Sequence, residues 1–137
     1  MVVLDGKVTS AKIRQELAIK VKELTAQGKK IPHLAAILVG EDGASRTYVN
    51  AKVRDCEEVG FGSTLIKLPS ETTEDELLKA IGKLNNDEDI DGYIVQLPLP
   101  KHIDETKVLL AVDPKKDVDG FHPQNVGKMT LNLPTYI

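Results

Sequence analysis

The sequence predicts an α/β domain with three layers, in which an open, mostly parallel sheet carries helices on both faces. Helical and extended patterns alternate along the chain in the order α-β-α-β-α-β-α, which is typical of parallel sheets with helical crossovers. The first extended segment, HLAAILV at residues 33–39, is almost entirely apolar, as strands covered on both faces are. With 137 residues, the chain is long enough to form one domain with a core of its own.

The first helix is expected over residues 10–27, where apolar side chains recur on one face. Thr9 or Ser10 can cap its start, and Gly28 can end it. The stripe consists of Ile13, Leu17, Val21 and Leu24. Their spacings of four, four and three are those of an amphipathic helix.

A second helix is expected from Ser45 to near Gly60, after a loop over residues 40–44. The next strand, STLIKL at residues 63–68, mixes polar and apolar side chains. Because it is more polar than the run at residues 33–39, we place it nearer an edge of the sheet.

A capping box begins the third helix. The hydroxyl of Thr73 and the carboxylate of Glu76 stand three residues apart, so each can bond a backbone N–H near the helix start. The apolar positions of this helix are Leu77, Leu78, Ile81 and Leu84.

The last part of the chain holds one more strand and one more helix. A polar turn at residues 85–91 leads to the strand YIVQL at residues 93–97. A short helix follows near residues 104–112. Beyond Pro114 the sequence has no clear period, so we expect an irregular segment.

Three polar residues of the second helix, Ser45, Tyr48 and Lys52, are spaced three and then four apart. On an α-helix, this spacing keeps them within roughly 60° of arc. An apolar stripe beside them consists of Val49, Val53 and Cys56. A hydroxyl, a phenol and an amine would thus stand where the buried face meets a cleft. The structural alternative is that Lys52 extends its amine to solvent and Tyr48 caps the core.

Further polar groups are expected where the strands end, because open α/β sheets bind ligands beyond the carboxyl ends of their strands. Gln96 stands at the end of a buried strand, where an amide is costly unless it is hydrogen-bonded, and Lys52 is the partner we expect. The loop LPLP follows. Pro98 and Pro100 fix φ and remove two donors, so this loop should be stiff and leave carbonyls free.

A pair of carboxylates stands in the segment KDVDGF at residues 116–121. Asp117 and Asp119 flank Val118, and Gly120 permits a close approach of the backbone. Either a ligand-facing carboxylate or an Asx-turn loop accounts for this pattern.

Composition argues against several classes of function. The formal net charge of -3 provides no electrostatic attraction to nucleic acid or to an anionic membrane. No apolar run approaches the ~20 residues of a membrane span. The N-terminal residues do not resemble a signal or transit peptide, so we expect a cytoplasmic location.

The side chains that bind metals are few and scattered. Cys56 is the only cysteine, so no internal disulfide is possible, and we expect it to be a small core residue. The histidines have no cysteine or acidic partner at the spacing of metal ligands. We therefore expect no metal site.

Two other α/β classes share part of this pattern. Tyr48 and Lys52 satisfy Y-x-x-x-K, the active-site pair of short-chain dehydrogenases. Those enzymes open with a strand and a glycine-rich dinucleotide turn, whereas this chain opens with an amphipathic helix. A phosphoacceptor receiver domain needs an aspartate at the end of its third strand, where this chain has Gln96.

Three blocks of sequence together resemble one family. They are VGEDGASRTYVNAK at residues 39–52, DGYIVQLPLPKH at residues 91–102 and DPKKDVDGFHPQNVGK at residues 113–128. Their joint occurrence resembles the N-terminal, folate-binding catalytic domain of bifunctional 5,10-methylenetetrahydrofolate dehydrogenase/5,10-methenyltetrahydrofolate cyclohydrolases. The likeness covers essentially the whole chain.

The resemblance implies a role for each matching residue on the second helix and at the third strand's end. Lys52 would be the catalytic lysine, Tyr48 would line the folate site beside it, and Ser45 would support that wall. Gln96 would hold and tune the lysine. Burial of Lys52 against the neighbouring apolar stripe would favour the neutral amine, which could take a proton from an attacking water.

The resemblance also implies how folate is held. Asp119 would accept two parallel hydrogen bonds from the amino-pyrimidinone edge of the pterin. Leu97 and Pro98 would shape the pocket through backbone and packing. The substrate would be 5,10-methylenetetrahydrofolate, oxidised with NAD(P)+ and then hydrolysed to 10-formyltetrahydrofolate.

Family members continue into an NAD(P)-binding Rossmann domain and a returning C-terminal helix, which residues 1–137 do not match. The motif G-x-G-x-x-G is absent from the sequence, so we expect no cofactor to be bound by these residues. The resemblance implies homodimers for intact members, whereas this chain alone is expected to self-associate. The alternative to an active enzyme is a fragment that binds folate without turnover.

Overall fold

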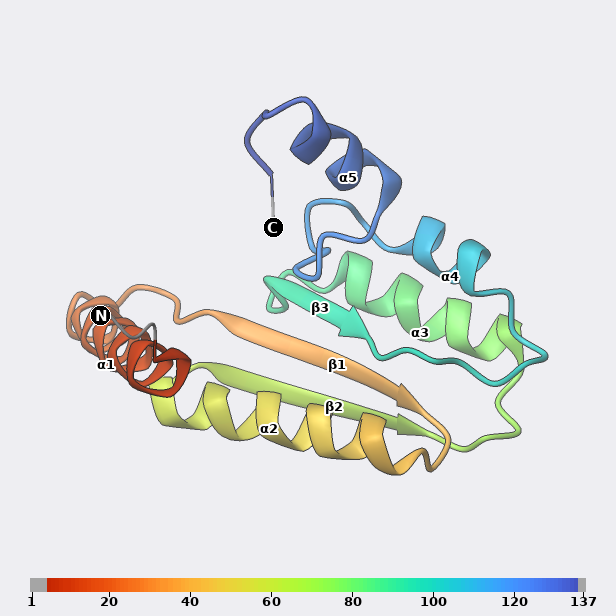
Figure 1. Ribbon diagram of the computed structural model, residues 1–137, viewed down its shortest axis with the longest axis horizontal. Helices are drawn as coiled ribbons and strands as arrows, with labels where there is room; N and C mark the ends of the chain where they lie inside the picture. Colours follow the sequence, from red (N-terminus) through yellow and green to blue (C-terminus); the bar gives the residue numbers. More distant parts are fainter. Residues whose placement is uncertain (1–4, 136–137) are drawn as a thin grey trace.

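A computed structural model describes residues 5–135 of the 137-residue chain. The elements, in chain order, are α1 (Gly6–Ala26), β1 (His33–Val39), α2 (Gly43–Val59), β2 (Gly62–Leu68), α3 (Glu74–Asn86), β3 (Gly92–Val95), α4 (Glu105–Ala111) and α5 (Pro123–Thr130). The three strands form a parallel sheet in the order β2-β1-β3 (Figure 1). The predicted α/β fold with a parallel sheet is confirmed.

The central strand is β1, and its seven residues are the predicted apolar run. Leu34 is level with Ser63 of β2 on one side and with Gly92 of β3 on the other. On the side of β3 that faces away from β1, Tyr93 of β3 makes an isolated parallel bridge to Asp117. The more polar strand β2 lies at an edge, as predicted.

Alternate side chains of β1 enter two separate hydrophobic clusters, one on each face of the sheet. Ala35, Ile37 and Val39 of β1 belong to the same cluster as Leu77 of α3 and Val108 of α4. Leu38 packs on the other face with Val49 of α2 and with Ile94. This alternation follows from the period of two along a strand. The sheet therefore carries helices on both faces, and the three-layer arrangement is confirmed.

Helix α1 lies across the end of α2, beside the starts of β1 and β2 (Figure 1). Arg14 pairs with Glu58 of α2, with Nε and Oε2 2.9 Å apart. The apolar stripe of α1 is only partly covered, since Val21 is buried while Ile13 is 51% exposed. None of the helices within residues 5–135 is both long enough and apolar enough to span a membrane.

Two predicted helix starts have different outcomes. The capping box of α3 is confirmed, because Thr73 Oγ1 accepts from the Glu76 N–H and Glu76 Oε2 accepts from the Thr73 N–H. The predicted start of α1 is wrong. Its cap is Asp5, whose carboxylate accepts from the backbone N–H groups of Lys7 and Val8, so neither Thr9 nor Ser10 begins the helix.

The prediction of an irregular segment after Pro114 is also wrong. Helix α5 occupies part of it, with Pro123 at its first position and His122 as its cap. The ring nitrogen Nδ1 of His122 accepts from the Gln124 N–H at 3.1 Å. This cap satisfies one of the donors that every helix start leaves free.

Candidate functional site

Helix α2 presents the predicted polar residues because both of its ends are fixed. The Asp42 carboxylate accepts from the Ser45 N–H at 2.7 Å at the N-cap, and this bond lowers the pKa of Asp42. Gly60 ends the helix in the left-handed region, at φ 84°, where a side chain would be strained. The helix between them carries Tyr48 and Lys52 in the predicted register.

Lys52 approaches the segment that follows α4. Its Nζ lies 3.5 Å from Asp119 Oδ1, so the amine and the carboxylate form an ion pair. The two side chains are 47% and 32% exposed, respectively. The structure thus brings together two predicted site residues that stand far apart in the sequence, and it leaves both accessible to a ligand.

The expectation that Lys52 is buried against the apolar stripe is wrong. Val49 is fully buried, but the side chain of Lys52 extends past the edge of the core toward Asp119. A long side chain can cover apolar surface with its stem while its charge stays near water.

Ser45 and Gln96 meet at the backbone of the loop after β3. Ser45 is 2% exposed, and its hydroxyl donates to the Leu97 carbonyl at 3.4 Å. Gln96 Nε2 donates to the same carbonyl at 2.8 Å. Among residues 5–135, the partner of the Gln96 amide nitrogen is therefore Leu97 and not Lys52. The expected free carbonyl is occupied by two donors.

The remaining predicted residues line the open side of this arrangement. Tyr48 is 64% exposed, one helical turn before Lys52, so its ring does not cap the core. Pro98 is exposed and Leu97 half-buried, and the peptide bond that joins them is cis. A planar ligand can therefore reach the Tyr48 ring from solvent.

The site residues fall into two groups along α2 rather than into one cluster beyond the sheet. Ser45, Gln96 and Leu97 lie at the carboxyl end of β3. Lys52 and Asp119 lie about 10 Å along the helix from Ser45, because each residue of a helix advances 1.5 Å. The candidate site thus extends along α2 from the end of β3 to Asp119, and an open cleft adjoins it at Lys52 and Asp119.

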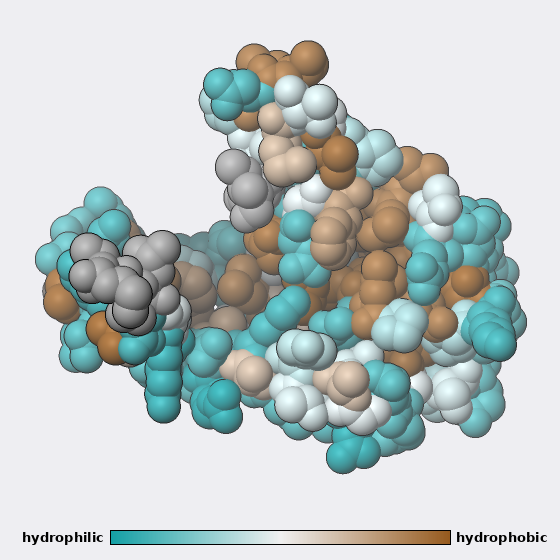
Figure 2. Space-filling view, viewed as in Figure 1, coloured by the Kyte–Doolittle hydropathy of each residue, from teal (hydrophilic) through white to brown (hydrophobic). Residues whose placement is uncertain are grey.

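An open cavity of about 460 Å³ adjoins Lys52 and Asp119. Apolar side chains from α1, α2 and the sheet form most of its wall, including Leu17, Val53 and Ile94. The face drawn in Figure 2 is hollowed between α1 and α5, with hydrophobic residues on its floor. A few charged side chains at a large apolar surface, here Arg14 and Asp55 besides Lys52 and Asp119, are a common composition for a small-molecule site.

Cys56 lines this cavity one helical turn after Lys52 and is only half-buried. Burial raises the pKa of its thiol, with smaller contributions from the neighbouring carboxylates of Asp55 and Glu57. The thiol therefore stays protonated near neutral pH and adds to the apolar wall.

Two buried polar side chains lie behind the site, of which the sequence analysis named Asp117 and missed Asn125. Asp117 is 5% exposed and Asn125 is 2% exposed, and Asn125 Nδ2 donates to Asp117 Oδ2 at 2.9 Å. The paired carboxylates of KDVDGF were a signal for Asp117. Asn125 had no comparable signal, because its helix was not predicted.

Comparisons with known proteins agree with this geometry. The family model of the tetrahydrofolate dehydrogenase/cyclohydrolase catalytic domain matches residues 4–119. The bifunctional protein FolD of Cytophaga hutchinsonii is 64% identical over 137 residues, which cover 100% of this chain and 47% of that protein. The chain spans about half the length of the curated relatives it matches.

Solved structures show the same fold. The bifunctional enzyme FolD-methylenetetrahydrofolate dehydrogenase/cyclohydrolase of Campylobacter jejuni superposes with a TM-score of 0.94 at 46% identity, covering 100% of this chain and 48% of that one. The FolD enzyme of Trypanosoma brucei, in complex with NADP cofactor and inhibitor, has a TM-score of 0.89 at 35% identity over 93% of this chain and 43% of that one. The chain therefore belongs to the tetrahydrofolate dehydrogenase/cyclohydrolase family and carries its catalytic domain.

Proposed function

We propose that this chain forms the folate site and supplies the catalytic lysine of an enzyme of one-carbon metabolism. The reactions are oxidation of 5,10-methylenetetrahydrofolate to 5,10-methenyltetrahydrofolate and hydrolysis of that cation to 10-formyltetrahydrofolate. The observation that carries the proposal is the 3.5 Å approach of Lys52 Nζ to Asp119 Oδ1 beside an exposed Tyr48. A base and a carboxylate thus meet at the margin of one cleft, with an exposed aromatic ring one helical turn before the base on α2.

Asp119 is the residue we assign to the pterin. Its carboxylate is one-third exposed, so the amino-pyrimidinone edge can donate two parallel hydrogen bonds to it. These bonds would take the carboxylate away from Lys52. The Tyr48 ring, which faces solvent, offers a negative π face to the cationic methenyl compound.

Lys52 is the base we assign to the hydrolytic step. Loss of its carboxylate partner and the approach of the methenyl cation both favour the neutral amine in the complex. The amine takes one proton from water as the water oxygen bonds to the methenyl carbon. In the hydroxylated intermediate the bond between the carbon and N5 then breaks, the hydroxyl proton is transferred to N5, and the formyl group remains on N10. The net change is the gain of one water and the release of one proton, which Lys52 has taken up.

We assign Ser45 and Gln96 to the support of the backbone at the end of β3. Both donate to the Leu97 carbonyl, which fixes the backbone where Leu97 and Pro98 would meet the ligand. Gln96 would therefore act on substrate through this backbone more than through Lys52.

The residues of this chain do not fit a nicotinamide cofactor, because the glycine-rich dinucleotide turn is absent from the sequence. We therefore derive no hydride-transfer step from these side chains. In the intact enzyme, NAD(P) would be held by a Rossmann domain that residues 1–137 do not match. Folate binding and the hydrolytic step are the parts that can be attributed to the described cleft.

The test is a pair of measurements on the purified chain. Calorimetric titration with tetrahydrofolate should show saturable binding, which Asp119→Ala should weaken. Absorbance of 5,10-methenyltetrahydrofolate should then be followed with and without the chain. Absence of any folate binding would refute the proposal.

Binding without turnover is the second candidate function, and two observations favour it. Lys52 is half-exposed, and the cavity beside it is open to solvent. Water that reaches the amine weakens the electrostatic effects on which the base depends. Methenyl loss at the rate of a buffer blank, with folate binding intact, would support this candidate.

A further inference from the structure

The segment that carries Asp119 is held by a buried polar pair that contributes nothing to the cleft directly. Asp117 Oδ2 accepts from the His122 N–H at 2.8 Å and from Asn125 Nδ2 at 2.9 Å. The first bond joins residues five apart, so it closes the turn in which Asp119 and Gly120 stand. Gly120 adopts φ 69°, and its N–H bonds the Asp117 carbonyl at 3.3 Å.

Asn125 links this turn to two other parts of the chain. Its Nδ2 also donates to the Pro114 carbonyl at 2.9 Å, and its Oδ1 accepts from Thr135 Oγ1 at 2.9 Å. All of the polar atoms of its side chain therefore have partners. A buried amide satisfied in this way fixes the position of α5 against the turn.

The backbone before Asp119 is fixed as well. The Tyr93 N–H donates to the Lys116 carbonyl at 2.9 Å, which attaches the segment to β3. Val118 packs so closely over Gly92 that a Cβ there would lie 2.3 Å from Val118 Cγ1. With both sides anchored, the turn between Asp117 and His122 has little freedom, and the direction of Asp119 follows from it.

A buried carboxylate is a costly way to hold a turn, because its desolvation must be offset by hydrogen bonds. Within residues 5–135, the side-chain partners of Asp117 are the two N–H groups named above, and no cation pairs with it. Such groups are retained in some proteins because they specify one geometry among several.

We propose that Asp117 and Asn125 are positioning residues, which set the turn so that the Asp119 carboxylate faces Lys52 and can receive the pterin. This inference rests on the proposed function and adds two residues to it. Both hydrogen bonds end on one oxygen, so an amide at position 117 can accept them equally well. Asp117→Asn should therefore preserve the turn, whereas Asp117→Ala should not.

The test is a double-mutant cycle on the 137-residue chain, with tetrahydrofolate affinity as the readout. Asp117→Ala should weaken binding about tenfold, as expected when buried donors lose their acceptor, and Asp117→Asn should stay within about twofold. In the Asp119→Ala background, Asp117→Ala should cost less than about twofold more, because its effect passes through Asp119. Equal losses in both backgrounds would overturn the inference.

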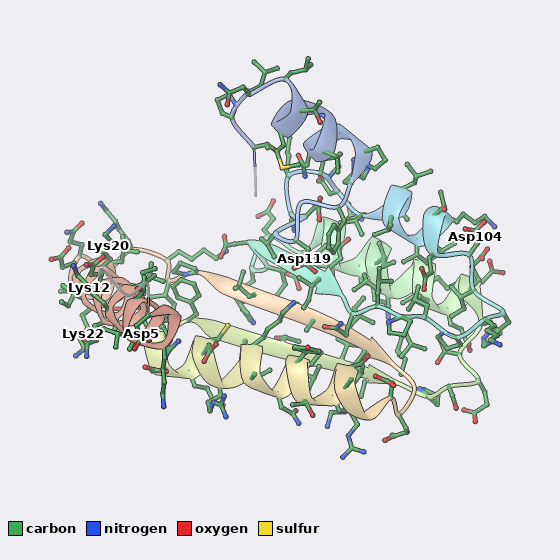
Figure 3. The ribbon with its side chains drawn as sticks, viewed as in Figure 1. Asp5, Lys12, Lys20, Lys22, Asp104 and Asp119 are labelled. Atoms are coloured by element: carbon green, nitrogen blue, oxygen red, sulfur yellow. The ribbon has the colours of Figure 1, made fainter. Side chains whose placement is uncertain are left out.

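Asp104→Ala is the matched control. The Asp104 carboxylate also accepts from two backbone N–H groups, of Thr106 and Lys107, but it caps α4. It lies far from Asp119 on the view in Figure 3. This variant should lose stability without losing affinity. If it weakens folate binding as much as Asp117→Ala does, the effect of Asp117→Ala is general destabilisation and the inference fails.

A measurement without ligand separates this inference from the proposed function. Amide hydrogen exchange over residues 118–125 should accelerate about tenfold in Asp117→Ala and in Asn125→Ala, while exchange in α3 stays unchanged. Unchanged exchange in residues 118–125 would overturn the inference even if folate binds. If Asp117→Ala does not fold, the cycle is run with Asn125→Ala. Failure of the wild-type chain to bind tetrahydrofolate would refute only the proposed function.

Discussion

The amine of Lys52 and the carboxylate of Asp119 are the two charges that meet in the cleft, and each controls what the other can do. At 3.5 Å and with both side chains partly exposed, the pair is loose enough for a ligand to separate it. A pterin that binds Asp119 would therefore also free Lys52. Substrate binding and the readiness of the base would then be coupled through a single contact.

Under the proposed function, removing the amine should separate the two reactions of an intact enzyme that contains this domain. Lys52→Met should lower the cyclohydrolase rate by about 10²–10⁴-fold, the usual contribution of a general base. Dehydrogenase activity should fall less, because removal of hydride needs no base. Both rates are measured spectroscopically, with Lys79→Met on α3 as the control. Equal losses of both activities would indicate that Lys52 only positions substrate.

Replacing the carboxylate should affect binding. Asp119→Ala should weaken folate binding by about 2–5 kcal/mol, the cost of leaving charged or paired donors unsatisfied. Asp119→Asn should be nearly as harmful, because an amide presents a donor to a pterin donor. Calorimetric titration of both variants checks this, with Asp113→Asn as the control. Near-normal affinity of Asp119→Asn would mean that the carboxylate does not bind the pterin edge.

Among single residues, the sequence predicted positions better than partners. Ser45, Tyr48 and Lys52 share a helix face because helical spacing is local. The hydrogen bond from Gln96 to the Leu97 carbonyl is local too. From chemistry alone, however, Lys52 was an equally good hydrogen-bond partner for the Gln96 amide. The approach of Lys52 to Asp119 depends on how two distant segments pack, which no spacing encodes.

Helices α3 and α4 are joined by one carboxylate. Glu74 pairs with Lys107 Nζ through one oxygen, while its other oxygen accepts from the Asp104 N–H at 3.0 Å. The hydrogen bond from Lys107 lowers the pKa of Glu74 below its usual 4.5, with the Asp104 N–H as the next cause. The same contact raises the pKa of Lys107.

These shifts predict how the contact depends on pH. A lowered folded-state pKa means that the Glu74 contribution to stability is present above pH 4.5 and is lost as pH falls through the folded-state value. The raised pKa of Lys107 means that its contribution is present below its unfolded-state pKa and is lost only as pH rises through the higher folded value. At neutral pH both contributions are present.

Glu74→Gln should therefore lower the free energy of unfolding most at neutral pH, and the difference from wild type should shrink as pH falls below 4.5. Urea denaturation across an acid series measures it. Glu23→Gln, on the exposed surface of α1, is the control. A difference that stays constant with pH would mean that Glu74 acts only as a neutral hydrogen-bond acceptor.

At the scale of elements, the prediction succeeded where signals are local and redundant. The apolar run of β1 and the capping box of α3 are each recognisable from a few consecutive residues. Helix α5 was not predicted, because it is short and contains Gly127. Its cap is a histidine ring, which is not a common cap. The start of α1 was misplaced because its apolar stripe begins at Ile13 and does not show how far the helix extends before it, to the cap at Asp5.

At the scale of the whole molecule, the structure of residues 5–135 has an uncovered apolar groove between α1, α2 and the sheet. Ile13 borders it and is 51% exposed. Exposed apolar surface of this kind promotes association. We therefore expect the isolated 137-residue chain to self-associate. Because water reaches Lys52 through the open groove, we also expect it to show little cyclohydrolase activity.

Sedimentation velocity over a series of protein concentrations tests that expectation. Ile13→Gln should shift the chain toward monomer, whereas Leu110→Gln, an equally exposed apolar residue on α4, should not. Monomer at every concentration for the unaltered chain would contradict the expectation. Turnover comparable to that of an intact enzyme would show that water exclusion around Lys52 is complete within this domain.

The fold class could be predicted because the alternation of elements and the apolar central strand agree with each other. The openness of the groove could not be predicted, because it depends on how closely the apolar side chains of α1 pack against the sheet. Three of the four stripe residues are at best partly covered, which periodicity does not reveal.

The strand order has a consequence for synthesis on the ribosome. The most apolar strand, β1, is translated first, yet its two neighbours begin only at Gly62 and Gly92. Until then the nascent chain exposes HLAAILV with both edges unpaired, which is a template for wrong pairing. Translation that slows between His33 and Val95 would prolong this exposure, so the yield of folded protein should depend on elongation rate and on chaperones that shield nascent strands.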